Sequence, residues 1–240
     1  ENGLKGVMLP TMWGEHAAYH DVKYDPFWEA CQDRGIVIHF HSGPAPHSEY
    51  FGAAFPNEDR SDELPGAMGA YVSEVMFWLY RPLTFMLWGG VFERFPRLKA
   101  MVVEGGTMFM VPSWLMLLDH NYTDVQFSAK LGDFRSHLSM APSEYFARNC
   151  GIGASCVPRR DLDMKDQIGL KQIMWGSDFP HPEGTWPNTA QYYVDTFKGF
   201  DADAGRQILG ENAIQFYGLD GDYLNSLAAD IGPSTSIFNG

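Results

Sequence analysis

Basic residues are scarce in this chain of 240 residues. It carries 17 Lys and Arg against 30 Asp and Glu, which gives a formal net charge of -13. An electrostatic field of that sign repels phosphate backbones and anionic lipid surfaces, and no run of five basic residues occurs to reverse it locally. The sequence therefore argues against a nucleic-acid-binding protein and against a membrane-surface protein.

Cysteines and long apolar runs are also few. The three cysteines include no Cys-x-x-Cys pair, which argues against a disulfide framework, a zinc ribbon or a thioredoxin-type motif. We expect a reducing, cytoplasmic location, and we interpret Cys150 and Cys156 as packing residues. The most apolar region, residues 76–91, is interrupted by Arg81 and Pro82, so it predicts a buried helix rather than a membrane span.

Short apolar segments alternate with helical patterns along the chain. We predict strands at residues 6–9, 36–41, 98–103, 149–155 and 173–175. The predicted helices are a first one that has Asp25 as its N-cap and ends at Gly35, one over 70–87 with a break at Pro82, one over 112–120, and a closing one over 203–216 that ends at Gly218. This alternation predicts an α/β fold with a parallel sheet.

No phosphate-binding glycine motif follows any of these strands. Gly-x-Gly-x-x-Gly and Gly-x-x-x-x-Gly-Lys-Ser/Thr are both absent, so a doubly wound nucleotide-binding domain has nothing with which to hold its phosphates. We therefore favour a TIM-type β/α barrel. We treat residues 1–240 as one domain, with a long helical insertion at about 44–98.

Polar side chains stand where several predicted strands end, which is where barrel enzymes place their active sites. His39 and His41 share one face of their strand, Glu104 ends the next predicted strand, and Asp178 follows the last one. Imidazole and carboxylate are ligands for zinc, iron or manganese, so the pattern predicts a divalent metal centre. Asp178 could also accept a proton from a metal-bound water.

Five segments together carry a family resemblance: IHFHSG at 38–43, WGGVFERFPRLK at 88–99, EGG at 104–106, WGSDFPHPEG at 175–184 and ILGENA at 208–213. With them the chain resembles the amidohydrolase-2 branch of the amidohydrolase superfamily, which includes relatives of aminocarboxymuconate semialdehyde decarboxylase. The resemblance extends over nearly the whole chain.

The resemblance implies a metal-dependent (β/α)8 barrel with ligands from a His-x-His or Asp-x-His on the first strand, His on the fifth and sixth, and Asp on the eighth. His41 matches the fifth-strand His and Asp178 the eighth-strand Asp. Glu104 stands where many relatives carry the sixth-strand His, and this exchange shifts the expected metal from zinc toward iron or manganese. His39 is a candidate ligand of a second metal or a residue that orients the first.

No first-strand ligand motif precedes the first predicted strand. By the matched motifs, the five strands are the last five of eight, so we expect an N-terminally truncated barrel that lacks about 90 residues at roughly 30 per unit. We expect the remainder to come from an upstream segment or from a partner chain. Open sheet edges also favour a homo-oligomer.

The leading hypothesis is a metal-dependent hydrolase that acts on a small carboxylate, cyclic or aromatic substrate through a metal-activated water, with Asp178 and His181 as catalytic residues. Non-oxidative decarboxylation is the alternative, and a dinuclear iron or manganese oxygenase is the third hypothesis. A non-enzymatic scaffold also remains open. His20, in the loop after the first strand, and Arg81 are candidate substrate-binding residues, and a structural salt bridge would equally explain Arg81.

Overall fold

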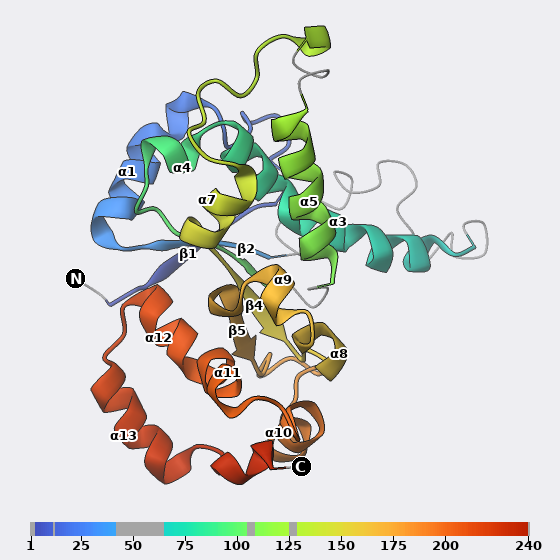
Figure 1. Ribbon diagram of the computed structural model, residues 1–240, viewed down its shortest axis with the longest axis vertical. Helices are drawn as coiled ribbons and strands as arrows, with labels where there is room; N and C mark the ends of the chain where they lie inside the picture. The colour runs from blue at the N-terminus through green and yellow to red at the C-terminus, as the bar shows by residue number, and fades with distance from the viewer. Residues whose placement is uncertain (1–2, 12, 42–64, 105–108, 125–128, 240) are drawn as a thin grey trace.

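The computed structural model describes residues 3–11, 13–41, 65–104, 109–124 and 129–239. Its centre is a parallel sheet in which five strands pair in chain order, β1-β2-β3-β4-β5 (Figure 1). The strands are β1 (Gly6–Leu9), β2 (Val37–Phe40), β3 (Ala100–Val103), β4 (Cys150–Ser155) and β5 (Ile173–Gly176). Successive parallel strands joined by helices form an arc of a TIM-type barrel, which confirms the predicted fold class and all five predicted strands.

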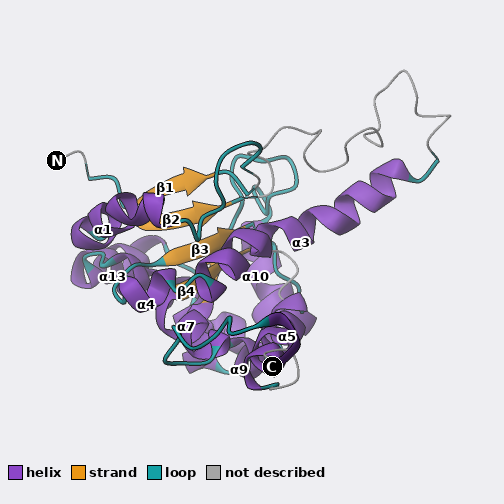
Figure 2. Ribbon diagram, turned by 90° about the horizontal axis from the view of Figure 1, so that it is seen from above, coloured by secondary structure: helices purple, strands orange, loops and turns teal. Residues whose placement is uncertain are grey.

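Helices fill the connections between the strands. They are α1 (Asp25–Arg34), α3 (Ala67–Trp88), α4 (Val91–Arg94), α5 (Met110–Thr123), α7 (Pro142–Asn149), α8 (Arg159–Leu162), α9 (Lys165–Ile168), α10 (Thr189–Phe197), α11 (Ala202–Arg206), a π-helical turn (Gln207–Glu211), α12 (Asn212–Tyr217) and α13 (Gly221–Ile231). Short 3₁₀ turns occur at Val22–Tyr24, Leu170–Gln172 and Thr235–Phe238. Figure 2 shows the strands running in one direction and α3 extending beyond their carboxyl ends.

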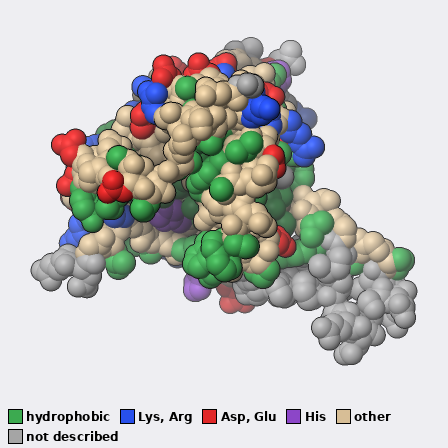
Figure 3. All heavy atoms as spheres, turned by 90° about the horizontal axis from the view of Figure 1, so that it is seen from below, with side chains coloured by type: hydrophobic (Ala, Val, Ile, Leu, Met, Phe, Trp, Pro, Cys, Tyr) green, Lys and Arg blue, Asp and Glu red, His purple; other side chains and the backbone are tan. Residues whose placement is uncertain are grey.

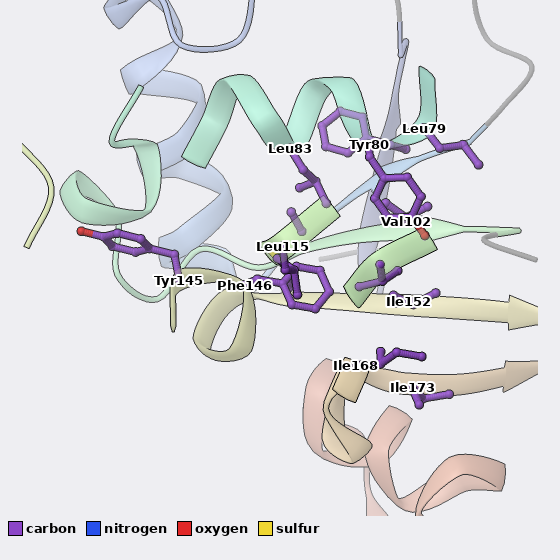
Figure 4. Close-up of a cluster of buried hydrophobic side chains, with 14 of the residues drawn as sticks. Leu79, Tyr80, Leu83, Val102, Leu115, Tyr145, Phe146, Ile152, Ile168 and Ile173 are labelled. Atoms are coloured by element: carbon purple, nitrogen blue, oxygen red, sulfur yellow. The ribbon is translucent and has the colours of Figure 1, made fainter. Parts of the chain in front are cut away.

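The two faces of the sheet bury different sets of side chains. One face carries the main core, to which Ile38, Val102 and Ile152 contribute. Figure 4 shows Leu79 and Leu83 of α3 between that helix and the strands. The other face is smaller and buries Val37, Met101 and Met174, with Phe216 and Tyr217 of α12 packed against them. The period-two alternation predicted for residues 36–41 is therefore confirmed.

The predicted break at Pro82 is wrong, because α3 continues through this residue to Trp88. Pro82 lacks the N–H that would close a helical hydrogen bond. Leu79, Leu83 and Met86 of the same helix are fully buried, however, and this packing holds the helix together across the proline. The first helix also begins one residue earlier than predicted, since Asp25 is already helical and Tyr24 is its N-cap.

Helix α13 was not predicted from the sequence. Tyr223, Leu227 and Ile231 form an apolar stripe at helical spacing, but none of the side chains of this helix is buried and these three are exposed. Figure 3 views the molecule from below in Figure 1 and shows hydrophobic side chains gathered in several patches on that side.

No helix in the described ranges has the length and apolar character needed to cross a membrane. Helices α3 and α4 lie inside the proposed insertion at about 44–98, while residues 42–64 fall outside the described part of the chain.

Candidate active site

The predicted site residues follow the carboxyl ends of adjacent strands. His41 comes directly after β2, Glu104 directly after β3, and Asp178 two residues after β5. Between them, Cys156 comes directly after β4. Because the strands are parallel and adjacent, these side chains belong to one edge of the sheet, the edge at which barrel enzymes carry their chemistry.

The backbone is strained at three of these strand ends. Within the described ranges, the non-glycine residues with positive φ are Glu104 (57°), Cys156 (49°) and Asp178 (59°). The left-handed region costs an L-residue with a side chain about 1–2 kcal/mol, and such strain is concentrated at functional sites. Three strained residues on three neighbouring strands mark this edge as the candidate active site.

His41 and Glu104 form a close pair across β2 and β3. His41 Nε2 lies 2.5 Å from Glu104 Oε2, and the two side chains are 33% and 26% exposed. This distance is shorter than the roughly 2.7–2.9 Å of ordinary imidazole–carboxylate contacts. The structure thus brings together two of the predicted metal ligands, at a point that solvent or a ligand can reach.

Asp178 and His181 form a second pair after β5. His181 Nδ1 lies 3.6 Å from Asp178 Oδ2, and the aspartate side chain is 20% exposed against 52% for the histidine. The His181 N–H donates to the Asp178 carbonyl oxygen at 2.8 Å, which closes the turn between them. His181 Nδ1 also accepts from the Glu183 N–H at 3.4 Å, so the pair is a shielded carboxylate close to a solvent-facing imidazole.

Cys156 lies at the end of β4, between the strands that precede Glu104 and Asp178, and it is only partly buried, which does not fit its interpretation as a packing residue. Burial raises the pKa of its thiol, and the negative charges of Asp178, Glu183 and Glu104 raise it further. The thiol Sγ also donates to the Glu183 carbonyl oxygen at 3.4 Å. A usable signal was its position directly after a predicted strand, which it shares with Glu104. Cys150 is buried, as predicted for a packing residue.

His39 is held away from the other candidates. Its Nε2 lies 2.6 Å from the Tyr217 hydroxyl, and its ring stacks on that of Tyr217. Burial lowers the pKa of this imidazole. His39 therefore contacts α12, whereas His41 contacts Glu104.

The two candidate substrate-binding residues both lie near Phe85 of α3. The His20 ring stacks on Phe85 at 5.0 Å between centroids, while the Arg81 guanidinium lies over Trp13 at 4.6 Å and near Phe85 at 5.6 Å. They line different pockets, of about 540 Å³ for His20 and about 750 Å³ for Arg81. Trp13, over which the Arg81 guanidinium lies, belongs to the loop after β1.

The side chains at the site are of the kinds that bind a divalent metal, but too few of them lie together to form a complete metal site. His41 and Glu104 offer imidazole and carboxylate, which zinc, iron and manganese accept. Among the described residues, no group of three or more His, Cys, Asp and Glu side chains lies close enough to hold an ion. The pair thus fits two positions of a metal centre, and a complete centre needs ligands from outside the described residues.

Comparisons with known proteins agree with this fold. The chain is 24% identical over 226 residues to 2-amino-3-carboxymuconate-6-semialdehyde decarboxylase from Dictyostelium discoideum, an alignment that covers 92% of this chain and 55% of that protein. The crystal structure of 5-carboxyvanillate decarboxylase from Sphingomonas paucimobilis matches with a TM-score of 0.66 and 24% identity, over 90% of this chain and 59% of that one.

The third similar protein is known from a structure that contains a metal. Dihydroxybenzoic acid decarboxylase from a Polaromonas species, with bound manganese and an inhibitor, matches with a TM-score of 0.56 and 18% identity, over 86% of this chain and 57% of that one. The chain thus spans between 55% and 59% of the length of these three relatives. The model of the amidohydrolase family matches residues 1–219. This protein belongs to the amidohydrolase family.

Proposed function

We propose that this protein is a metal-dependent, non-oxidative decarboxylase of a small aromatic or cyclic carboxylate. The observation that carries the proposal is the pairing of His41 with Glu104 and of Asp178 with His181 at one edge of the sheet. The three similar proteins named above, all decarboxylases, support this reaction over the hydrolysis that we first favoured. A dinuclear oxygenase has less support, because Tyr217 holds the imidazole that would bind a second metal.

The reaction replaces a carboxylate by a proton. The bond between the substrate carbon and its carboxylate breaks, carbon dioxide leaves, and the electron pair stays on the substrate carbon, which then takes a proton. A divalent cation held in part by His41 and Glu104 would supply positive charge for the substrate anion when bound. Manganese in the Polaromonas enzyme makes that ion the first choice for this chain.

The Asp178–His181 pair is suited to the proton step. His181 is 52% exposed and can take up a proton from water, while the 20% exposed carboxylate of Asp178 can hold it close to the site. Arg81 is proposed to contact a substrate carboxylate through its guanidinium. His20 lines a different pocket and is not part of this proposal.

Isotope labels separate decarboxylation from hydrolysis. The protein, supplied with manganese, would be incubated with carboxyl-¹³C-labelled 5-carboxyvanillate and dihydroxybenzoates in H₂¹⁸O. We expect ¹³CO₂ and an aromatic product free of ¹⁸O. Absence of ¹³CO₂ from every one of these labelled carboxylates would contradict the proposed decarboxylation.

Two substitutions connect the reaction to the site. We expect Asp178→Asn to lower the rate of CO₂ release by about 10²–10⁴-fold, the range for loss of a general acid or base, and His41→Ala to weaken manganese binding. His120→Ala is the matched control, because this histidine is 64% exposed and contacts Asp124, the C-cap residue of its helix. Equal rates in Asp178→Asn and His120→Ala would remove Asp178 from the mechanism.

A further inference from the structure

We propose that Gly184 is a positioning residue that fixes the backbone of Asp178 and His181 for the reaction. This inference rests on the proposed function, in which these two residues move the proton. Gly184 lies three residues after His181, in the turn that follows β5.

The turn has no room for a side chain at this position. A Cβ on Gly184 would lie 2.8 Å from the Ser177 carbonyl oxygen, 2.9 Å from that of Asp178 and 3.0 Å from that of His181. All three contacts are with backbone atoms, which cannot turn aside as the end of a flexible side chain can. A methyl group at residue 184 must therefore displace the backbone on which Asp178 and His181 stand.

The same carbonyl groups hold the turn closed. The Thr185 N–H donates to the Ser177 oxygen at 2.9 Å, the His181 N–H to the Asp178 oxygen at 2.8 Å, and the Gly184 N–H to the His181 oxygen at 2.9 Å. Each of the three carbonyl oxygens that would clash with a Cβ at residue 184 therefore already accepts a backbone hydrogen bond within the turn.

Two side-chain contacts anchor the turn to the rest of the molecule. The Cys156 thiol, at the end of β4, donates to the Glu183 carbonyl oxygen at 3.4 Å. The hydroxyls of Thr185 and Thr189 are 3.0 Å apart, and Thr185 is buried. The turn is therefore attached to the end of β4 through Cys156 and to the start of α10 through Thr189. Gly184 lies between Glu183 and Thr185, the two residues that make these contacts.

The test compares Gly184→Ala with Gly210→Ala. Gly210 is the matched control, because a Cβ there would have no heavy atom within 4 Å. Amide hydrogen exchange, read residue by residue, reports whether the turn opens. In Gly184→Ala we expect exchange at His181 and Thr185 to rise at least about tenfold, with the melting temperature within a few degrees of wild type. Gly210→Ala should leave both amides protected.

Kinetics then link the turn to the reaction. We expect Gly184→Ala to lower kcat by about 10²-fold with little change in KM, since a displacement of about 1 Å at reacting groups has that effect. Unchanged exchange in Gly184→Ala, or a kcat equal to that of Gly210→Ala, would overturn the inference. If the wild-type protein releases no CO₂, the proposed function fails, while the exchange data still decide whether Gly184 holds the turn.

Cys156→Ala provides a second variant in case Gly184→Ala does not fold. It removes the thiol contact with Glu183 and adds no volume. We expect faster exchange at the same two amides, by a smaller factor than in Gly184→Ala. Full protection of these amides in Cys156→Ala would show that the turn does not depend on its attachment to β4, and would contradict the proposed arrangement.

Discussion

A hydrogen bond from a residue distant in the sequence lowers the pKa of the Glu93 side chain, which lies outside the candidate site. The Tyr145 hydroxyl donates to the Glu93 carboxylate, and the Ser139 hydroxyl donates to the same oxygen at 2.9 Å. The bond from Tyr145 is the main reason that the pKa of Glu93 lies below its usual value of 4.5. The ionised carboxylate therefore stabilises the folded state.

This gives a prediction of pH-dependent stability for Tyr145→Phe. A carboxylate whose pKa is depressed by folding contributes stability above its unfolded value of 4.5, and loses it as the pH falls through the folded value. At pH 7 the variant should lose about 1 kcal/mol, a modest figure because Glu93 is partly exposed. Denaturant unfolding should show the difference from wild type shrinking below pH 4.5.

Part of that difference does not depend on pH, because the Tyr145 oxygen also accepts from the Ser139 N–H at 3.0 Å. Tyr223→Phe is the control, since Tyr223 is 60% exposed. A loss in Tyr145→Phe that is equal at pH 7 and pH 3.5 would contradict the role given to Glu93.

At the scale of elements, a buried asparagine attaches the C-terminal helices to the sheet. The Asn212 side-chain amide donates to the carbonyl oxygens of Leu170 and Ile173, both at 2.8 Å, and Asn212 is 3% exposed. Ile173 begins β5, so the first residue of α12 is bonded to the start of the last strand. At the other end of α12, the Tyr217 hydroxyl lies within hydrogen-bond distance of His39 on β2.

We predict that Asn212→Ala is strongly destabilising. The substitution leaves two carbonyl groups without their buried donor, at about 1–3 kcal/mol each, so a loss of roughly 2–4 kcal/mol is expected. Urea unfolding measures this loss. Gln191→Ala is the control, because Gln191 forms only an exposed contact with Asp195 on its own helix. A cost below about 0.5 kcal/mol for Asn212→Ala, the range of a neutral surface substitution, would be incompatible with this attachment.

Elements that face a core could be predicted from the sequence, whereas those held by tertiary contacts could not. The strand at Val37–Phe40 follows from its alternating side chains, and α1 from the glycine that ends it. Helix α3 continues through Pro82 because side chains along its length are buried against the sheet. A local sequence pattern does not show these tertiary contacts, so the helix was predicted to break there. Helix α13 carries Tyr223, Leu227 and Ile231 at helical spacing, so this element could have been predicted and was missed.

For the whole molecule, the five β/α units place residues distant in the sequence at one edge. His41, Glu104 and Asp178 could be predicted as candidates because each is a polar residue that follows an apolar strand. The separation of His39 from His41 could not, since it depends on Tyr217, 178 residues further along the chain. Cys156 was missed because a cysteine near a strand is ordinarily a packing residue.

The central claim is that a divalent metal and this edge of the sheet together release carbon dioxide from a carboxylate substrate. The most direct test is the rate of ¹³CO₂ release from labelled substrate before chelation, after chelation, and after manganese is returned. We predict that chelation abolishes ¹³CO₂ release and that manganese restores it. In His41→Ala, we expect manganese to restore release only at higher concentrations. Release that continues unchanged in the chelated protein would contradict the central claim.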